Sequence, residues 1–412
     1  MGGSPSFASR LRSPRDGGRS LELWLSKHAD WVLYPFHSTE PSPSLEAHRD
    51  IFLAAAMAAE RVVLPDLLRD WPTKRYLDPR YPQVREASRQ WFKSFDFLNA
   101  KSTKAFDRCD FAKLAMLSYR FSDLAQCQLG SDLMTLLYAF DEYTDWEDEH
   151  STRGIADLFM DGLRNPDKPR PEGECVLGEM ARQFWSAGRK IATPMAERHF
   201  IETMQQWVDN VVDEARDHDH SQIRTIDEYW TIRRHTSACL PTLASLELEF
   251  DFPEDVYRHP LLERLRDLSM FSIVGGNDLY SYNVERAKGH ELHNLLTLVM
   301  HEKNLNLQSA VDWIGEWHDE IVAEFMECKA NLPSWGVEID TQVRRYVDGM
   351  MFWVRGADDW SFEGPRYFGS KGLEVQKTRV VYMLPKLDAS ALGNKGETVA
   401  PAAALGGFRM QM

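Results

Sequence analysis

The stretch Leu136-Leu137-Tyr138-Ala139-Phe140-Asp141-Glu142-Tyr143-Thr144-Asp145 joins an apolar run to an Asp-Glu-x-x-Asp cluster. In a helix, Asp141 and Asp145 lie four residues apart on one face, and Leu133 and Leu137 extend the same stripe toward the N-terminus. Two stacked carboxylates at the end of an apolar stripe suit a hard divalent cation at the mouth of an apolar pocket. Alone, in a chain with 63 acidic residues, such a cluster is also typical of a solvated acidic helix face.

The helical pattern continues through most of the chain after residue 61. Apolar residues recur at intervals of three and four, as in Trp207, Val208, Val211 and Val212. We expect helices at 83–97, 104–108, 110–120, 131–149, 153–163, 175–191, 193–217, 226–236, 239–248, 255–274, 276–287, 290–301, 305–329 and 336–356. The run Val380–Met383 is the only stretch with a strand-like pattern.

This pattern predicts a single all-α domain over residues 61–375. An N-terminal extension, residues 1–60, is expected to be partly disordered because its first part is rich in Gly, Ser, Pro and Arg. A loosely ordered C-terminal tail is expected over residues 376–412.

Composition narrows the classes of partner. The net charge of −15 argues against nucleic acid, because phosphate backbones are held by fields of Lys and Arg. An anionic substrate would need metal ions or a local Arg cluster. The five cysteines lack CxxC spacing and suggest free thiols in a reducing compartment, so we expect a cytoplasmic protein. No stretch approaches a membrane span of roughly 18 apolar residues, so no stable membrane anchor is expected.

A second polar stripe lies in Gly275–Glu285. Asn277, Ser281 and Glu285 are spaced by four, so they stay within one stripe of a helix. Their amide, hydroxyl and carboxylate oxygens suit Mg²⁺, which usually bridges to substrate phosphates. The apolar neighbours place this stripe at the rim of a hydrophobic volume.

Two further segments contain arginines of the kind that bind an anionic substrate: Arg233–Ala238 and Trp360–Gly369. With the two polar stripes, they occur in the order in which class I terpene synthases carry an aspartate-rich motif, a diphosphate-sensing Arg, an Asn-Asp-x-x-Ser-x-x-x-Glu motif and a late Arg-Tyr pair. Over about residues 61–372 the chain resembles this family, and within it the fungal, basidiomycete-type sesquiterpene synthases.

The resemblance implies a class I terpenoid synthase helical bundle around a central active-site cavity. It implies a lyase that ionises and cyclises farnesyl diphosphate with three Mg²⁺ ions and releases diphosphate. The implied metal ligands are Asp141, Asp145, Asn277, Ser281 and Glu285. The implied diphosphate ligands are Arg234, Arg366 and Tyr367, and Lys288 is expected to reach the diphosphate in place of the Lys that related synthases often have at position 284.

Other roles are implied in the same way. Glu142 is expected to orient Arg234, and Asp145 to lie farther from the metal than Asp141. The expected cavity wall consists of Leu137, Tyr138 and Trp360. Aromatic faces there would stabilise a carbocation by roughly 0.5–2 kcal/mol each. Several stretches resemble protoilludene-type cyclases.

Two departures keep alternatives open. Val284 stands where related synthases often have Lys, and Ala238 stands where they often have a Gly at a helix break. The alternatives are a chain-elongating prenyltransferase and a catalytically silent isoprenoid-diphosphate-binding protein. The acidic pair Asp358-Asp359 is expected to be a helix-end acidic patch. A monomer or a homodimer is expected.

Overall fold

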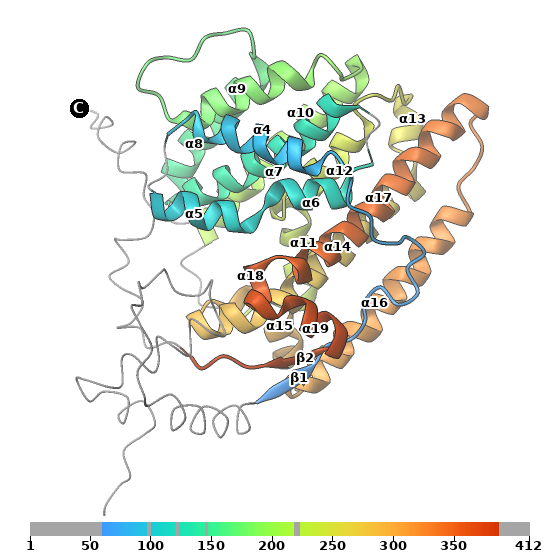
Figure 1. Cartoon of the computed structure of the whole chain (residues 1–412). Coiled ribbons are helices and arrows are strands. Elements are labelled where there is room, and N and C mark those ends of the chain that lie inside the picture. The colour runs from blue at the N-terminus through green and yellow to red at the C-terminus, as the bar shows by residue number, and fades with distance from the viewer. Residues whose placement is uncertain (1–59, 97–99, 121–122, 145–146, 218–222, 387–412) are drawn as a thin grey trace, which may run out of the picture.

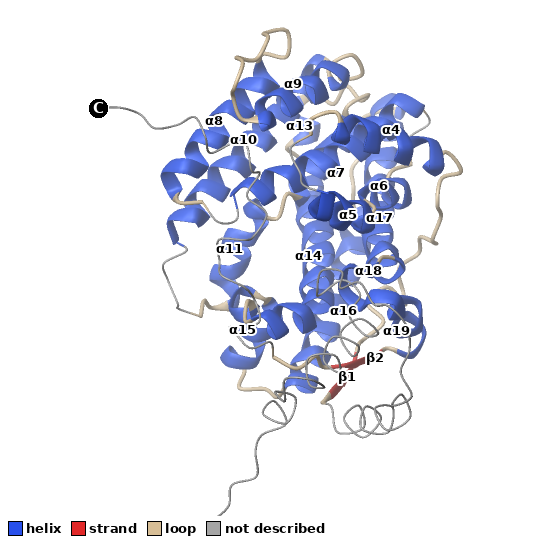
Figure 2. Ribbon diagram, turned by 60° about the vertical axis from the view of Figure 1, so that its left-hand side comes forward, coloured by secondary structure: helices blue, strands red, loops and turns tan. Residues whose placement is uncertain are grey.

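The computed structural model describes residues 60–96, 100–120, 123–144, 147–217 and 223–386, which form a helical bundle with a small sheet at one end (Figures 1 and 2). The earlier helices are α4 (Tyr81–Lys93), α5 (Ala100–Cys109), α6 (Phe111–Ser118), α7 (Leu124–Thr144), α8 (Glu149–Arg164), α9 (Val176–Gly188) and α10 (Pro194–Asp217). The later helices are α11 (Ile226–Thr236), α12 (Cys239–Ala244), α13 (Glu254–Tyr257), α14 (Pro260–Lys288), α15 (Leu295–Glu302), α16 (Leu307–Ala330), α17 (Val337–Glu363), α18 (Pro365–Phe368) and α19 (Gly372–Thr378). Short 3-10 turns lie at Ser245–Glu247 (η1), Glu291–His293 (η2) and Gly369–Lys371 (η3).

Helix α7 runs through the core, because its residues are apolar on nearly every side. Leu133, Leu136 and Phe140 are fully buried, and the ring of Phe140 packs against Phe159 and Trp207. This packing holds the last turn of α7 in place, and that turn carries Asp141.

Helix α14 is continuous over 29 residues, whereas the sequence suggested a division near Gly275. The glycine is needed for close packing rather than for a break, since a Cβ at Gly275 would lie 2.7 Å from the Trp317 ring on α16. The helix begins with Pro260 and ends at Lys288, where it is capped by Gly289, whose φ of 79° glycine adopts readily. Asn277, Ser281 and Glu285 therefore share one rigid element. Helix α17 also extends beyond the expected end at 356, to Glu363.

The two ends of the described chain meet in a two-stranded antiparallel sheet, where β1 (Arg61–Val63) pairs with β2 (Val380–Tyr382). The strand expected at Val380 is confirmed, but β1 was missed because three residues carry too little pattern. Asn283 on α14 bonds the β2 segment, donating to Tyr382 O and accepting from Leu384 N. The boundary expected at residue 375 is therefore too early, since residues 376–386 pack on the domain. Residues 1–59 and 387–412 lie outside the described ranges.

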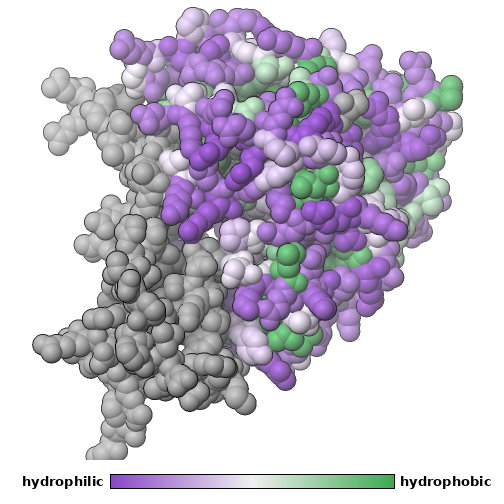
Figure 3. Space-filling model, viewed as in Figure 1, coloured by the Kyte–Doolittle hydropathy of each residue, from purple (hydrophilic) through white to green (hydrophobic). Residues whose placement is uncertain are grey.

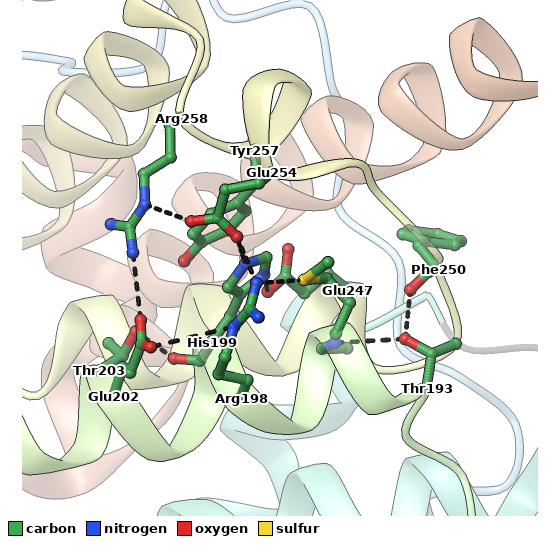
Figure 4. A network of polar contacts seen from close by, with 12 residues as sticks. Thr193, Arg198, His199, Glu202, Thr203, Glu247, Phe250, Glu254, Tyr257 and Arg258 are labelled. Carbon is green, nitrogen blue, oxygen red and sulfur yellow. Dashed lines mark hydrogen bonds and ion pairs between the residues drawn. The ribbon is translucent and has the colours of Figure 1, made fainter.

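A buried polar network ties α10 to η1 and α13 (Figure 4). The His199 ring lies between two carboxylates, with Nδ1 3.1 Å from Glu247 Oε1 and Nε2 3.1 Å from Glu254 Oε2. It also stacks on Tyr257 at 3.6 Å. Burial opposes the charge on His199, but the two carboxylates outweigh it and raise its pKa. The network therefore holds the short segments η1 and α13 against the long helix α10.

The face shown in Figure 3 is mostly hydrophilic, with small separate hydrophobic patches. In the part of the chain that the structure describes, every helix is too short or too polar to cross a bilayer.

Ala238 separates α11 from α12 in a left-handed conformation, with φ 57° and ψ 5°. Residues with a Cβ disfavour this conformation by roughly 1–2 kcal/mol, whereas glycine does not. We expect Ala238→Gly to raise the free energy of unfolding by up to about 1 kcal/mol, after glycine's larger unfolded-state entropy is allowed for. Denaturant unfolding of the two proteins measures this. A less stable glycine variant would contradict the account of the break.

Asp132 on α7 faces α4, where its Oδ1 accepts from Ser88 Oγ at 2.6 Å, and it also accepts from Gln128 Nε2 at 2.8 Å. Burial raises the pKa of Asp132 to about 7. Because the folded chain keeps this proton where the unfolded chain loses it, stability falls as pH rises from about 4 to about 7, by up to about 4 kcal/mol. Asp132→Asn should therefore raise the melting temperature at pH 8 and change it little at pH 4. Equal shifts at both pH values would contradict this.

Candidate active site

A cavity of about 330 Å³ lies between the bundle's central helices. One end is polar and is lined by Asp141 from α7, Glu214 from α10, Arg233 from α11, Asn277 from α14, and Arg366 and Tyr367 from α18. The rest of the wall is mixed: Leu67, Leu68, Val274, Trp353 and Val354 are apolar, while Ser272, His318, Asp358 and Ser361 are polar. This combination suits a ligand with a charged head and an apolar body.

Asp141, in the last turn of α7, faces the cavity, as its motif position predicted. Asp145 lies outside the described residues. Glu142 lies beside the Tyr138 hydroxyl and near Lys288. It does not pair with Arg234, whose guanidinium bonds Asp267, so that expectation is corrected.

The Asn277 amide lies at the polar end, where its Nδ2 donates to the Tyr367 hydroxyl at 2.6 Å. Ser281 and Glu285 follow one and two turns later on α14. Asn294, the N-cap of α15, contacts this stripe: its Nδ2 lies 3.0 Å from Glu285 Oε2 and 2.8 Å from Asp278 O. Asn294 was not predicted from the sequence, because its contact crosses a turn that no helical spacing reveals.

The donors at this end fit a hard cation such as Mg²⁺. Asp141 and Asn277 line the cavity and offer carboxylate and amide oxygens, whereas Ser281 and Glu285 lie farther along α14 and are not among the lining residues. No cluster of three or more His, Cys, Asp or Glu side chains with metal-site geometry occurs among the described residues. A cation here would thus rely on the mixed set of Asp141 and the α14 stripe, completed by water or by a ligand's own oxygens.

The arginine that faces the cavity is Arg233, whereas Arg234 was expected from the sequence. Neighbouring helical residues point about 100° apart, so only one of the two can face inward. Arg234 points away, and its Nε donates to Asp267 at 2.8 Å. The sequence pair Arg233-Arg234 carried no signal that distinguished the two.

Buried groups hold Arg233 in place. Its Nη2 lies 4.0 Å from Oδ1 of Asp278, whose Oδ2 accepts from the Tyr229 hydroxyl at 2.6 Å and from Leu295 N at 2.8 Å. Burial alone would lower the pKa of Arg233, but Tyr229 and Asp278 raise it. Burial raises the pKa of Asp278 to about 6. Asp278 is the second residue of the motif in Gly275–Glu285, yet its role here became visible only in the fold.

The late Arg-Tyr pair also reaches the cavity. Arg366 and Tyr367 lie on α18, whose first residue, Pro365, follows directly after α17 and Gly364. Lys288, at the last turn of α14, lies close enough to Arg366, Glu285 and Glu142 for their charges to act on it. Burial, and then Arg366, lower the pKa of Lys288. Two cationic side chains, Arg233 and Arg366, thus line the cavity, and Lys288 lies near Arg366.

The cavity wall differs in part from expectation. Trp360 lines it and is fixed by its Nε1, which donates to Cys109 O at 2.9 Å. Leu137 and Tyr138 are not among the residues that line the cavity, so their assignment to the wall is corrected. Tyr138 packs instead against Phe106 and Phe111. The patch expected at 358–359 is also corrected, since Asp359 is buried and Asp358 lines the cavity, where its Oδ1 accepts from the Tyr280 hydroxyl at 2.6 Å.

Comparisons with known proteins decide the family. A family model described as "Terpene synthase family 2, C-terminal metal binding" matches residues 132–324. A Delta(6)-protoilludene synthase of Stereum hirsutum is 42% identical over 354 residues, covering 86% of this chain and 95% of that one. The chain belongs to the terpene synthase family. Sesquiterpene synthase Agr9 of Cyclocybe aegerita is 45% identical over 324 residues, covering 78% of this terpene synthase and 87% of Agr9.

Solved structures show the same fold. A linalool/nerolidol synthase from Streptomyces clavuligerus has a TM-score of 0.64 at 19% identity, covering 72% of this terpene synthase and 99% of that chain. The structure of a-eudesmol synthase has a TM-score of 0.61 at 19% identity, covering 71% and 98%. The predicted fold class, the family and the enzyme class, a lyase of the fungal sesquiterpene synthase type, are confirmed. The cytoplasmic location, the oligomeric state and the absence of a nucleic-acid partner stay predictions.

Proposed function

We propose that this terpene synthase ionises and cyclises farnesyl diphosphate with three Mg²⁺ ions and releases diphosphate and a sesquiterpene. The observation that carries the proposal is the joint placement of Asp141, Asn277, Arg233 and Arg366 in the lining of one cavity, together with apolar side chains such as Leu67, Leu68 and Val354. The names of the relatives support a fifteen-carbon substrate.

Mg²⁺, when bound, would neutralise the negative charge that grows on the leaving diphosphate. Asp141 would hold metal from α7, while Asn277, Ser281 and Glu285 would hold it from α14. Asn294 fixes one carboxylate oxygen of Glu285, so that the stripe is arranged before the ligand enters. Asp145 is proposed as a further metal ligand by its motif position alone.

The diphosphate would be bound by four side chains: Arg233, Arg366, Lys288 and Tyr367. The guanidinium groups offer paired donors that match phosphate oxygens. Arg233 is pre-oriented by Asp278 and Tyr229, so little rearrangement is needed as charge develops. The Asn277–Tyr367 hydrogen bond connects the proposed metal ligands on α14 to the side chains that would bind the diphosphate.

The apolar wall would hold the carbocation and exclude water, which would otherwise quench it. Trp360 offers an aromatic face beside Arg366 and Tyr367. The relatives of Stereum hirsutum and Armillaria gallica are named Delta(6)-protoilludene synthases, and we propose a product of that type.

The proposal is tested by incubating the purified chain and Mg²⁺ separately with C10, C15 and C20 isoprenoid diphosphates and analysing the extracts by gas chromatography. We expect a cyclic hydrocarbon from the C15 substrate. A chain-elongating prenyltransferase would instead consume isopentenyl diphosphate and form longer diphosphates. A silent binding protein would bind the C15 diphosphate without releasing hydrocarbon.

A further inference from the structure

A hydroxyl and an imidazole are paired in the cavity wall. Ser272 on α14 and His318 on α16 both line the cavity, and Ser272 Oγ lies 2.7 Å from His318 Nε2. Ser272 precedes Asn277 by five residues, which places it about 7.5 Å farther along the helix axis. The pair therefore lies about one and a half turns of α14 from Asn277 and shares the cavity lining with Leu67, Leu68 and Val354.

The imidazole is neutral at physiological pH. His318 is only 1% exposed, and burial lowers its pKa to about 4, while the backbone of Leu67 has a smaller, opposite effect. A neutral imidazole adds no positive charge that would repel a carbocation, and it keeps a lone pair that can take a proton. Ser272 is also buried, at 4% exposure.

Burying the hydroxyl of Ser272 and the imidazole of His318 removes both groups from water, which costs free energy. The single hydrogen bond between them offsets this cost only in part. Leu67, Leu68, Trp353 and Val354, which belong to the same wall, contribute no group that can take a proton. A cyclisation that ends in an olefin needs such a group, because the last cation must lose a proton. Ser272 and His318 supply such a group within the cavity lining.

We propose that Ser272 and His318 form the base that ends the reaction, an inference that rests on the function proposed above. The C–H bond next to the cationic carbon breaks, and its electron pair becomes the new C=C bond. The proton passes to Ser272 Oγ as the serine's own proton passes to His318 Nε2. The imidazolium returns the proton to water once the products leave.

The experiment compares products and substrate consumption for wild type, Ser272→Ala and His318→Gln with farnesyl diphosphate and Mg²⁺. Gln can accept the serine hydrogen bond but cannot take the proton. In both variants we expect the share of the main olefin to fall about tenfold or more in favour of other olefins and alcohols. Substrate consumption should stay within about threefold of wild type, since ionisation occurs at the polar end.

Ser361→Ala is the matched control. Ser361 also lines the cavity, but its Oγ donates to Ala357 O within its own helix, so its removal should leave the product ratio unchanged. If both variants give unchanged products but melt at lower temperatures, the Ser272–His318 hydrogen bond only stabilises the fold, and the proposal is overturned. A product change in Asp358→Asn alone would also overturn it, because that carboxylate lines the same cavity. If wild type releases no sesquiterpene, it is the proposed function that fails.

Discussion

Glu285→Gln should lower kcat/KM for farnesyl diphosphate by about 10³-fold or more, while the fold is retained. Gln keeps the size of the side chain and can still accept the Asn294 hydrogen bond. It removes the negative charge that a divalent ion needs from the α14 stripe. The rate of hydrocarbon formation against Mg²⁺ concentration measures the effect, and thermal unfolding without Mg²⁺ reports on the fold.

Glu263→Gln is the matched control for that variant. Glu263 lies in the first turn of the same helix, at the end remote from the stripe, so the same chemical change should leave the rate near wild type. Near-normal turnover in Glu285→Gln would contradict the metal role. Equal loss in both variants would point to damage to α14 instead.

Arg233→Gln should lower kcat/KM by about 10²–10³-fold, the typical effect of removing one donor to a developing anion. Arg233 lines the cavity and is held by Asp278, so its charge lies where the diphosphate would bind. Arg234→Gln should change kcat/KM by less than about threefold, because its guanidinium bonds Asp267 near the surface and an exposed pair contributes little.

The two arginine variants serve as controls for each other, being adjacent and chemically identical. Diphosphate release measured over a range of substrate concentrations distinguishes loss of binding from loss of ionisation. A large loss in Arg234→Gln with a small loss in Arg233→Gln would reverse the assignment made from the fold.

The sequence predicted most helices because their apolar positions repeat with the helical period. The predicted helix boundaries were wrong where a glycine can either break a helix or allow close packing between helices. Gly275-Gly276 suggested a break, but Gly275 serves close contact with Trp317 on α16. Such tertiary contacts leave no local pattern. The three-residue β1 was likewise too short to show alternation.

Motif spacing located Asp141 and Asn277 at the cavity, because their helices set which face they occupy. It could not choose between Arg233 and Arg234, since that depends on the rotation of α11 against α14. Tyr229 and Asn294 were missed for a related reason: each meets Asp278 only through packing between elements. Leu137 and Tyr138 were assigned to the wall from their nearness to Asp141, but Leu137 is part of the hydrophobic core and Tyr138 packs against Phe106 and Phe111.

The most direct test of the account is a crystal structure of the chain with Mg²⁺ and an unreactive farnesyl diphosphate analogue. We expect Mg²⁺ on Asp141 and on the Asn277, Ser281 and Glu285 oxygens. The diphosphate should accept hydrogen bonds from Arg233 and Arg366, with the isoprenoid chain extending toward Ser272 and His318. A diphosphate bound outside this cavity, or held by Arg234 instead of Arg233, would contradict the account.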